Sequence, residues 1–414
     1  MFGMRHGYGR LRSARFRVRA AVAVALAASV LVGAGCGSES HADETKPVDL
    51  SKLDTGTYPT KPHQYAPKDA ALAARNAEAL RLGSAMPLPM EIDPALTHTM
   101  LGVHPFTGAD SLEGTAFLDM LNIKDFAANT PGLVAGFATA AQSEDDWNIS
   151  RSMRQAVMIF ESPDAANSAA LALAHSGFFP GTSRVPPVPV PSTAYPSAQV
   201  IWLPDDQILA SFYATGQFVI ISTAVNEENW QLKVSDLPGL QTLADKATAA
   251  AVDRLATFQP TAKDKLSDLP LDPQSMLRLT IPLPASPIFA YAFDGTLDKR
   301  TDLGLASDAA KTRASFDKAG VDYVSYGTTQ LIRTRDAAAA KDLYEGRTRT
   351  KFEQLIDSPP GLSTAQCFKG TRSGSPSFHC YLTYGRYLAQ AMSTQQQDAY
   401  QQISAQYAIL ANDK

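Results

Sequence analysis

The chain has 414 residues, of which 37 are Lys or Arg and 41 are Asp or Glu, and 45% are hydrophobic. This is the composition of an ordinary globular protein, and the slight acidic excess excludes a broad basic surface for nucleic acid. A chain of this length exceeds what one hydrophobic core usually accommodates, so two domains are expected.

The first 35 residues have the features of a bacterial export signal. Six arginines and no acidic residue precede an apolar stretch at residues 20–32. A membrane-spanning helix needs roughly 20 apolar residues, whereas this stretch is shorter. It ends in Gly33, Ala34 and Gly35, the small residues that a signal peptidase needs beside the bond it cuts. The leader therefore predicts export followed by cleavage.

Cys36 follows these small residues directly and precedes a polar run, which is typical of bacterial lipoproteins. Cleavage before Cys36 would free its thiol for a diacylglyceryl group, with palmitate as an expected acyl chain, and two acyl chains anchor a protein stably. The motif departs from the usual pattern at Gly33, where lipoproteins have Leu or Val. The alternative is an ordinary secretory peptide that is cut near Ala34 or later. The prediction is an exported protein, lipid-anchored to the outer face of the cytoplasmic membrane.

Removal of residues 1–35 makes the protein more acidic. It leaves 31 basic and 41 acidic residues and a formal charge of −10. An acidic surface disfavours electrostatic docking on an anionic membrane, so the lipid on Cys36 would supply the attachment. Nucleic acid is not expected as a partner.

Residues 36–66 are expected to form a flexible tether, because they are polar and show neither helical nor strand periodicity. A short helix is predicted at residues 69–82, where alanine, leucine and helix-favouring Arg and Glu follow Pro67. The folded body of the protein is expected to begin there.

A weak internal repeat organises the rest of the chain. In the first half, an apolar strand at residues 156–160 leads to a helix start with Ser162 or Asp164 as a cap, of which Asp164 is matched to the second half. In the second half, residues 329–332 lead to Asp336 in the same way. Residues 212–219 and 380–388 then match each other: in each, a strand with Tyr leads to Gly and an aromatic strand. Such matches predict the same supersecondary unit twice.

Each half also ends in a helical pattern with one apolar stripe, at residues 237–258 and 394–410. Partner strands are predicted ahead of each repeat, at residues 133–137 and 321–326. The element order predicts an α+β protein of two similar bodies, each a mainly antiparallel sheet covered on one face by helices.

The predicted domain order follows from these segments. It is a signal peptide at 1–35, the tether at 36–66, a first α+β body at 67–265, a proline-rich interdomain segment at 266–290 and a second α+β body at 291–414. The interdomain segment has five prolines, which exclude a continuous helix or a central strand. Another proline cluster at 186–191 is a stiff surface loop or, alternatively, a polyproline II docking segment.

Cysteine usage agrees with export. The chain has three cysteines, and a lipidated Cys36 leaves Cys367 and Cys380 as a pair outside the cytoplasm. The loop between them is rich in Gly, Ser and Pro, and a crosslink of this size stabilises by about 2 to 3 kcal/mol. A structural disulfide is predicted, because the spacing is not CxxC and His379 is the one further ligand nearby.

No catalytic motif stands out. A G-x-S-x-G elbow is absent, and His175 with Ser176 is interpreted as a helix end. His98 and His104 are too far apart in sequence for a helical metal pair, and Asp93 could complete a site only if the fold brought the three together. No metal site and no cofactor are therefore expected.

Two acidic clusters, residues 144–146 and 205–206, are predicted to be turns. The competing possibility is a pair of catalytic carboxylates facing each other across a cleft. Trp147 and Trp230 each follow an acidic turn and are candidates either for a carbohydrate or lipid site or for the edge of the core.

The leader, the segment VDLSKLDTGTYPTKP at residues 48–62, the block LPMEIDP at residues 88–94 and the paired bodies together resemble a family of actinobacterial envelope lipoproteins, of mycobacterial or nocardial type. The family is built on a duplicated domain of unknown function. The resemblance covers most of the mature chain. It implies an envelope location and no particular activity, since no catalytic or binding residues are established for the family.

Three functions from different classes remain. The preferred one is a non-enzymatic, membrane-anchored module that binds an envelope amphiphile, glycan or protein. The second is a hydrolase of cell-wall glycan or lipid whose site is assembled from distant residues, such as His98, His104 and Asp93. The third is a structural scaffold, for which a closed interface without a pocket is expected.

Overall fold

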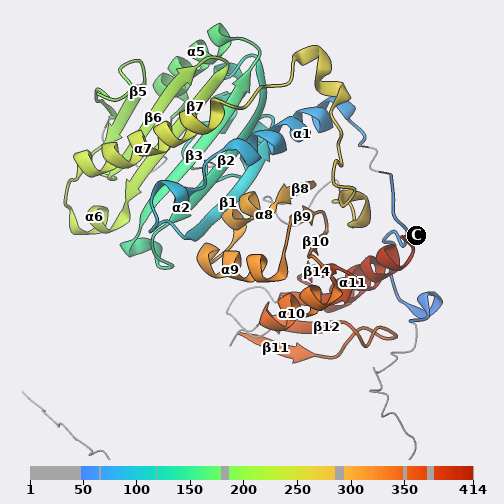
Figure 1. The fold of residues 1–414 in the computed structure, drawn as a ribbon. Helices are drawn as coiled ribbons and strands as arrows, with labels where there is room; N and C mark the ends of the chain where they lie inside the picture. The colour runs from blue at the N-terminus through green and yellow to red at the C-terminus, as the bar shows by residue number, and fades with distance from the viewer. Residues whose placement is uncertain are drawn as a thin grey trace, which may run out of the picture. The chain divides into compact units, whose positions relative to one another are not determined.

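Two antiparallel sheets of seven strands each organise the described part of the chain (Figure 1). The computed structural model describes residues 48–64, 67–117, 119–178, 186–284, 293–347, 352–370 and 377–413. Contacts join Val48–Lys414 into one unit. The predicted signal peptide and Cys36 lie outside the described residues.

The first sheet has the strand order β1-β2-β3-β7-β6-β5-β4, with antiparallel neighbours throughout. Its strands are β1 (His98–Phe106), β2 (Leu133–Gln142), β3 (Arg151–Phe160), β4 (Val188–Pro189), β5 (Gln199–Leu203), β6 (Ile208–Thr215) and β7 (Phe218–Asn226). The main helices after β3 and β7 are α5 (Pro163–Ala172) and α7 (Leu237–Leu255). We call these elements the first copy.

The second sheet has the order β8-β9-β10-β14-β13-β12-β11, which is the same order position by position. Its strands are β8 (Gly295–Asp298), β9 (Tyr323–Tyr326), β10 (Thr329–Arg333), β11 (Glu353–Ile356), β12 (Gln366–Gly370), β13 (Phe378–Tyr384) and β14 (Tyr387–Ser393). Helices α10 (Ala337–Arg347) and α11 (Gln396–Ala411) correspond to α5 and α7. This second copy confirms the predicted α+β class and the two similar bodies.

Further helical segments fill the connections. They are η1 (Leu50–Lys52), α1 (Ala70–Ala85), α2 (Pro89–Ile92), α3 (Ala109–Leu112), α4 (Ile123–Asn129), η2 (Trp147–Ile149), η3 (Leu173–Gly177), α6 (Glu227–Leu232), η4 (Lys263–Asp268), η5 (Leu277–Leu279), α8 (Lys299–Asp302), η6 (Leu303–Leu305) and α9 (Ala309–Ala319). The predicted helix at residues 69–82 corresponds to α1, whose first turn is capped by Asp69.

Helices cover both faces of each sheet, whereas the sequence predicted one covered face. In β6, Phe212 packs in the core that contains α5 and Leu209 in the core that contains α7. In β10, Ile332 packs with α10 and Leu331 with α11. Neighbouring side chains of a strand point to opposite faces, so the two helices of each copy lie on opposite faces. The physical reason is that strands such as β2 and β3 are buried along nearly their whole length, on both faces.

The two equivalent helices begin with different caps. The Ser162 hydroxyl accepts a hydrogen bond from the Ala165 amide at 3.1 Å in α5, and the Asp336 carboxylate accepts one from the Ala339 amide at 2.8 Å in α10. The sequence matched Asp164 with Asp336. That match was two residues off, because Ser162 is the equivalent of Asp336 and Asp164 lies inside the first turn, where a negative charge suits the helix dipole.

The described part of the segment expected as a tether, residues 48–64, contacts the second copy. The Tyr58 hydroxyl donates to the Asp398 carboxylate of α11 at 2.7 Å, and the Asn412 amide donates to the Thr60 carbonyl at 2.9 Å. Leu53 is buried in the core that the second sheet forms with α11. In the proline-rich segment, Met276 and Ile281 are buried in that core as well.

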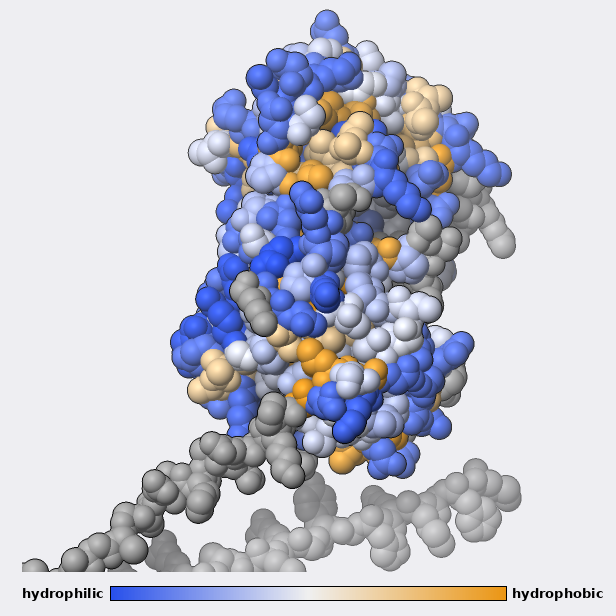
Figure 2. Space-filling view, turned by 90° about the vertical axis from the view of Figure 1, so that its right-hand side faces the viewer, coloured by the Kyte–Doolittle hydropathy of each residue, from blue (hydrophilic) through white to orange (hydrophobic). Residues whose placement is uncertain are grey.

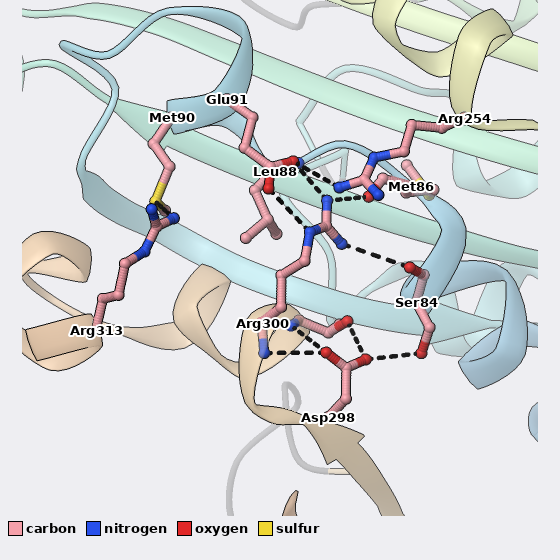
Figure 3. Close-up of polar contacts among 10 residues, drawn as sticks. Ser84, Met86, Leu88, Met90, Glu91, Arg254, Asp298, Arg300 and Arg313 are labelled. Carbon is pink, nitrogen blue, oxygen red and sulfur yellow. Dashed lines mark hydrogen bonds and ion pairs between the residues drawn. The ribbon is translucent and has the colours of Figure 1, made fainter. Parts of the chain in front are cut away.

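Helices α1 and α2 join the two copies, and Figure 3 shows the polar contacts at this junction. The Glu91 carboxylate of α2 accepts hydrogen bonds from Arg300 Nε of α8 at 2.9 Å and from Arg254 of α7 at 3.1 Å. The Ser84 hydroxyl of α1 donates to the Asp298 carboxylate at 2.8 Å. One carboxylate thus holds an arginine from each copy.

A disulfide joins Cys367 and Cys380, as predicted. The two residues lie directly opposite each other on β12 and β13, and both are fully buried. Their Cα atoms are 4.1 Å apart. The crosslink therefore fixes the pairing of these two strands beneath α11.

The surface in Figure 2 is mainly hydrophilic, with apolar residues in small separate patches. Among the described residues, every helix is too short or too polar to cross a membrane. The face of the molecule drawn in Figure 2 has no broad apolar surface.

Candidate functional site

Of the three residues proposed for a hydrolase or metal site, His98 begins β1, and His104 and Asp93 each have their own partners. His104 is buried and its Nδ1 lies 2.6 Å from the Pro105 carbonyl oxygen, and burial lowers its pKa to about 4. Asp93 forms an ion pair with Arg151 at 3.4 Å and accepts from the Ala95 amide. No group of three His, Cys, Asp or Glu residues within the described ranges is arranged to hold a metal ion.

His175 and Ser176 form a helix end, as predicted. They lie in η3, directly after α5. The Ser176 hydroxyl donates to the Ala172 carbonyl at 3.1 Å, and His175 Nδ1 lies 2.9 Å from the Leu171 carbonyl. Each side chain thus faces the backbone one turn earlier and not its neighbour.

Both acidic clusters are turns, as predicted, and both lie at the same end of the first sheet. Residues 144–146 join β2 to β3, and Asp146 accepts from the Asn148 amide at 3.0 Å to start η2. Asp205 and Asp206 join β5 to β6. The register shows that these turns share one end, because Arg151 pairs with Asn226 and Ile208 with Val225.

All three tryptophans of the chain lie at this end of the first sheet. Trp147 is in η2, Trp202 near the end of β5 and Trp230 in α6. Trp147 and Trp230 stack, with ring centroids 6.5 Å apart and an angle of 30° between the planes. Trp147 is 52% exposed, so this pair is not a closed core.

The segments that carry this cluster distinguish the first copy from the second. In the first copy, α6 lies between β7 and α7, whereas in the second copy β14 ends at Ser393 and α11 begins at Gln396. Likewise, β2 and β3 are joined through η2, whereas β9 ends at Tyr326 and β10 begins at Thr329. The added segments therefore lie at one end of one copy. Loops added to a repeated scaffold are where binding functions concentrate.

An open cleft of about 840 Å³ lies among these segments. Its lining consists of Trp202, Pro204, Asp205, Asp206, Gln207, Asn229, Trp230, Lys233, Val234 and Ser235. The β5–β6 turn forms one side, and α6 with the segment leading to α7 forms the other. Figure 1 shows α6 beside the start of α7. The volume is in the range of small-molecule sites, and aromatic rings with a few polar groups are the usual lining of such sites.

Two polar atoms of the cleft lining lack hydrogen-bond partners within the described part of the chain. They are Trp202 Nε1 and Asp206 Oδ2, and both are shielded from solvent. Lys233 ends α6 with φ of 57°, and its ammonium group lies 5.3 Å from the centre of the Trp230 ring. The cleft thus has aromatic side chains, a lysine and acidic side chains in its lining.

A smaller hollow of about 240 Å³ lies near the junction of the copies and has paired charges. Arg300 holds Glu91, and Lys299 forms an ion pair with Asp317 at 2.6 Å. These pairs join elements of the fold to each other. The tryptophan cleft is therefore the stronger candidate for binding.

Sequence reasoning singled out Trp147 and Trp230 but missed Trp202 and Lys233. Trp202 lies on β5, far from Trp230 in sequence, and the sheet register brings these two segments together. Lys233 lies one helical turn after Trp230, at the end of α6. The difference in connection length between the two copies was the signal that could have directed attention to α6.

Comparison with known proteins gives a family but no activity. Residues 65–271 match the N-terminal part, and residues 294–413 the C-terminal part, of a domain of unknown function, DUF7373. The first match contains β1 to β7 and the second contains β8 to β14. No curated protein matches the chain.

Proposed function

The chain belongs to the DUF7373 family, and from this premise we propose that it is an exported, lipid-anchored envelope protein that binds a ligand in the tryptophan cleft without transforming it. The family carries no known activity. The proposal therefore depends on the chain's own residues.

The leader and Cys36 support export and anchoring at the outer face of the cytoplasmic membrane. The basic start, the short apolar stretch and the small residues before Cys36 are the features of a lipoprotein signal. Residues 48–64 contact α11 and so belong to the folded unit. In this proposal, residues 36–47 alone link the lipid anchor to that unit. Twelve residues reach at most about 40 Å when extended. The protein would thus stay close to the membrane.

Two of the three tryptophans line one open cleft and the third, Trp147, stacks on Trp230, and this arrangement carries the binding proposal. A tryptophan that serves the core is buried, whereas Trp147 is 52% exposed. The cluster depends on η2 and α6, which have no counterpart in the second copy and are not needed to complete the sheet. Their presence at the cleft favours a functional role over a structural one.

The same observation separates the proposal from its alternatives. A scaffold needs no cleft with aromatic walls. A hydrolase built from His98, His104 and Asp93 would require these side chains to meet, and His104 and Asp93 are engaged with Pro105 and Arg151 instead. Binding without catalysis is the function that the geometry supports best.

Native mass spectrometry of the full chain, purified in mild detergent from its own membrane, tests the proposal. We expect the mass of a chain cleaved before Cys36 and lipidated, together with a bound small molecule. A Trp202→Phe/Trp230→Ala variant should keep the lipid and lose the small molecule. An Asp145→Asn variant is the control, because Asp145 is exposed in the adjoining turn and does not line the cleft.

Two results would contradict the proposal. An unlipidated chain would remove the anchor. A ligand-free wild type whose tryptophan fluorescence does not respond to an extract of the cell envelope would remove the binding function.

A further inference from the structure

Exposed apolar side chains gather beside the cleft. Of the nine large apolar residues that are exposed among the described residues, four lie in η2, in α6 or directly after α6. Each of the four is between 49% and 64% exposed, and they are Trp147, Ile149, Leu232 and Val234. We call these four residues the apolar patch. Single exposed apolar residues are common, whereas a group of them marks a site of interaction.

The two segments that carry the apolar patch are in contact with each other. The stacked tryptophans join η2 to α6. In addition, the Gln231 side-chain amide donates to the Asn148 side-chain oxygen at 3.3 Å. Ile149 follows Asn148 in the sequence, and Leu232 follows Gln231. The apolar side chains of η2 and α6 therefore belong to one continuous surface.

The fold does not require this surface. At the same positions, the described residues of the second copy have only short connections, residues 327–328 and 394–395, and these contain no large apolar side chain. Side chains that stay in water also bring the fold little hydrophobic stabilisation. The exposure of the apolar patch is therefore better explained by binding than by folding.

Carboxylates border the apolar patch. Glu144, Asp145 and Asp146 lie in the turn before η2, and all three are exposed. Glu228 is also exposed and lies one helical turn before Leu232, on the same side of α6. Glu144, Asp145 and Glu228 form no ion pair with any described residue. Negative charge without a partner thus lies beside exposed apolar side chains.

We propose that the apolar patch binds a second polypeptide, whose contact segment combines apolar side chains with Lys or Arg. The partner's apolar side chains would pack on the patch, where an exposed tryptophan is a typical centre of binding energy. Its cations would pair with the bordering carboxylates, which raises the association rate and selects against other partners. This surface goes beyond the proposed function, because Trp147, Ile149 and Leu232 lie outside the cleft lining.

The charges disfavour two other occupants. A second copy of this chain would bring the same carboxylates face to face, where like charges repel. A bilayer with anionic headgroups would be repelled for the same reason. Of the nearby cations Lys233 and Arg151, Arg151 already pairs with Asp93 at 3.4 Å. The surface therefore keeps an excess of negative charge, which a basic polypeptide complements.

Photo-crosslinking in the cells that make the protein tests which occupant is bound. In the full chain, Leu232 is replaced by p-benzoylphenylalanine, which under ultraviolet light links to the molecule in contact with it. The same replacement at Leu72 is the matched control, because Leu72 is 47% exposed on α1. We expect a link to one polypeptide from position 232 and not from position 72. Mass analysis of the linked peptide should find apolar residues together with Lys or Arg.

The apolar part of the surface is tested with that linked peptide, made synthetically and titrated against the full chain in mild detergent. Ile149→Ser/Leu232→Ser should weaken its binding by about tenfold or more. Leu72→Ser should leave the affinity unchanged. The double variant should keep the small molecule of the cleft in native mass spectrometry, because neither residue lines the cleft. Unchanged circular dichroism shows that its fold is intact.

The acidic part is tested with the same peptide at several salt concentrations. Glu144→Gln/Asp145→Asn/Glu228→Gln should weaken binding by about tenfold at low salt and remove most of its salt dependence. Asp264→Asn is the control, because it changes an exposed carboxylate of η4, and it should bind as the wild type does.

The possible results separate this surface from the cleft. A link from position 232 to phospholipid or to a second copy of the chain would overturn the inference, and so would equal linking at positions 232 and 72 or none at either. Equal affinity of Ile149→Ser/Leu232→Ser and the wild type for the peptide would also overturn it. A protein that binds the peptide but carries no small molecule would support this surface and contradict the proposed ligand cleft.

Discussion

Gly216 and Gly385 occupy the same position in the two copies. Each is the first residue of a two-residue turn, between β6 and β7 and between β13 and β14, and their φ angles are 53° and 51°. Such turns favour glycine because a positive φ is unfavourable for other L-residues. Counting back from these glycines, Tyr213 of β6 corresponds to Leu382 of β13. The sequence match, which paired the tyrosine of one strand with Tyr381 of the other, is therefore one residue out of register.

The first prediction concerns the backbone at these glycines. Gly385→Ala should lower the free energy of unfolding by about 1 to 2 kcal/mol, because a Cβ costs this much at positive φ. A Cβ at either glycine meets open space, so the cost is that of the backbone alone. Gly385→Asn should cost less, because Asn tolerates this conformation. Urea denaturation measures both, and equal losses for Ala and Asn would contradict the explanation.

The second prediction concerns the disulfide. Cys367→Ala/Cys380→Ala should lower the free energy of unfolding by about 2 to 3 kcal/mol, since the crosslink restricts a short loop of the unfolded chain. Alkylation without reduction, followed by peptide mass analysis, should find both cysteines unmodified in the wild type. Cys36→Ala is the control and should leave the stability of the folded unit unchanged. A free Cys367 thiol in the oxidised protein would contradict the pairing.

The repeat was predictable from sequence, because each block is a strand followed by a helix start, and such patterns are local. The covering of both faces was not predicted, because alanine-rich helices such as α5 show only a weak apolar stripe. The cleft was missed for a different reason. Trp202 and Trp230 lie on separate segments, and only the antiparallel register of β5, β6 and β7 brings their ends together.

The third prediction concerns the ion pairs at the junction of the copies. Burial alone would raise the pKa of Glu91, but hydrogen bonds from Arg300, the Leu88 amide and Arg254 lower it to about 2. A carboxylate with a lowered pKa contributes stability above its unfolded pKa and loses this contribution as the pH falls through the folded value. Because Glu91 is partly exposed, solvent screening reduces the contribution to about 1 to 2 kcal/mol.

Glu91→Gln should therefore destabilise the protein by about 1 to 2 kcal/mol at neutral pH. The difference from the wild type should shrink as the pH falls from about 5 to about 2. Urea denaturation at several pH values measures this, with Asp49→Asn as an exposed control that pairs with Lys52 on the surface. A difference that stays constant with pH would show that the charge of Glu91 is not the cause.

The fourth prediction has the opposite sign. Burial raises the pKa of Asp294 to about 6, against the effect of the hydrogen bond that its carboxylate accepts from the Leu283 amide. A carboxyl group with a raised pKa binds its proton more tightly in the folded state than in the unfolded state. Its protonation therefore stabilises the fold as the pH falls from about 6 to about 4, and its ionisation destabilises the fold above that range.

Asp294→Asn removes this titration and keeps an oxygen that can accept from Leu283. We expect the variant to be more stable than the wild type at neutral pH, by about 1 to 3 kcal/mol, and to approach the wild type near pH 4. Asp268→Asn is the control, because its carboxylate is exposed beside Lys265, and it should leave the pH dependence unchanged. If Asp294→Asn and the wild type showed the same pH dependence between about pH 4 and 6, the result would contradict the raised pKa of Asp294. It would also contradict the burial of its carboxyl group, which is the cause of that raised pKa.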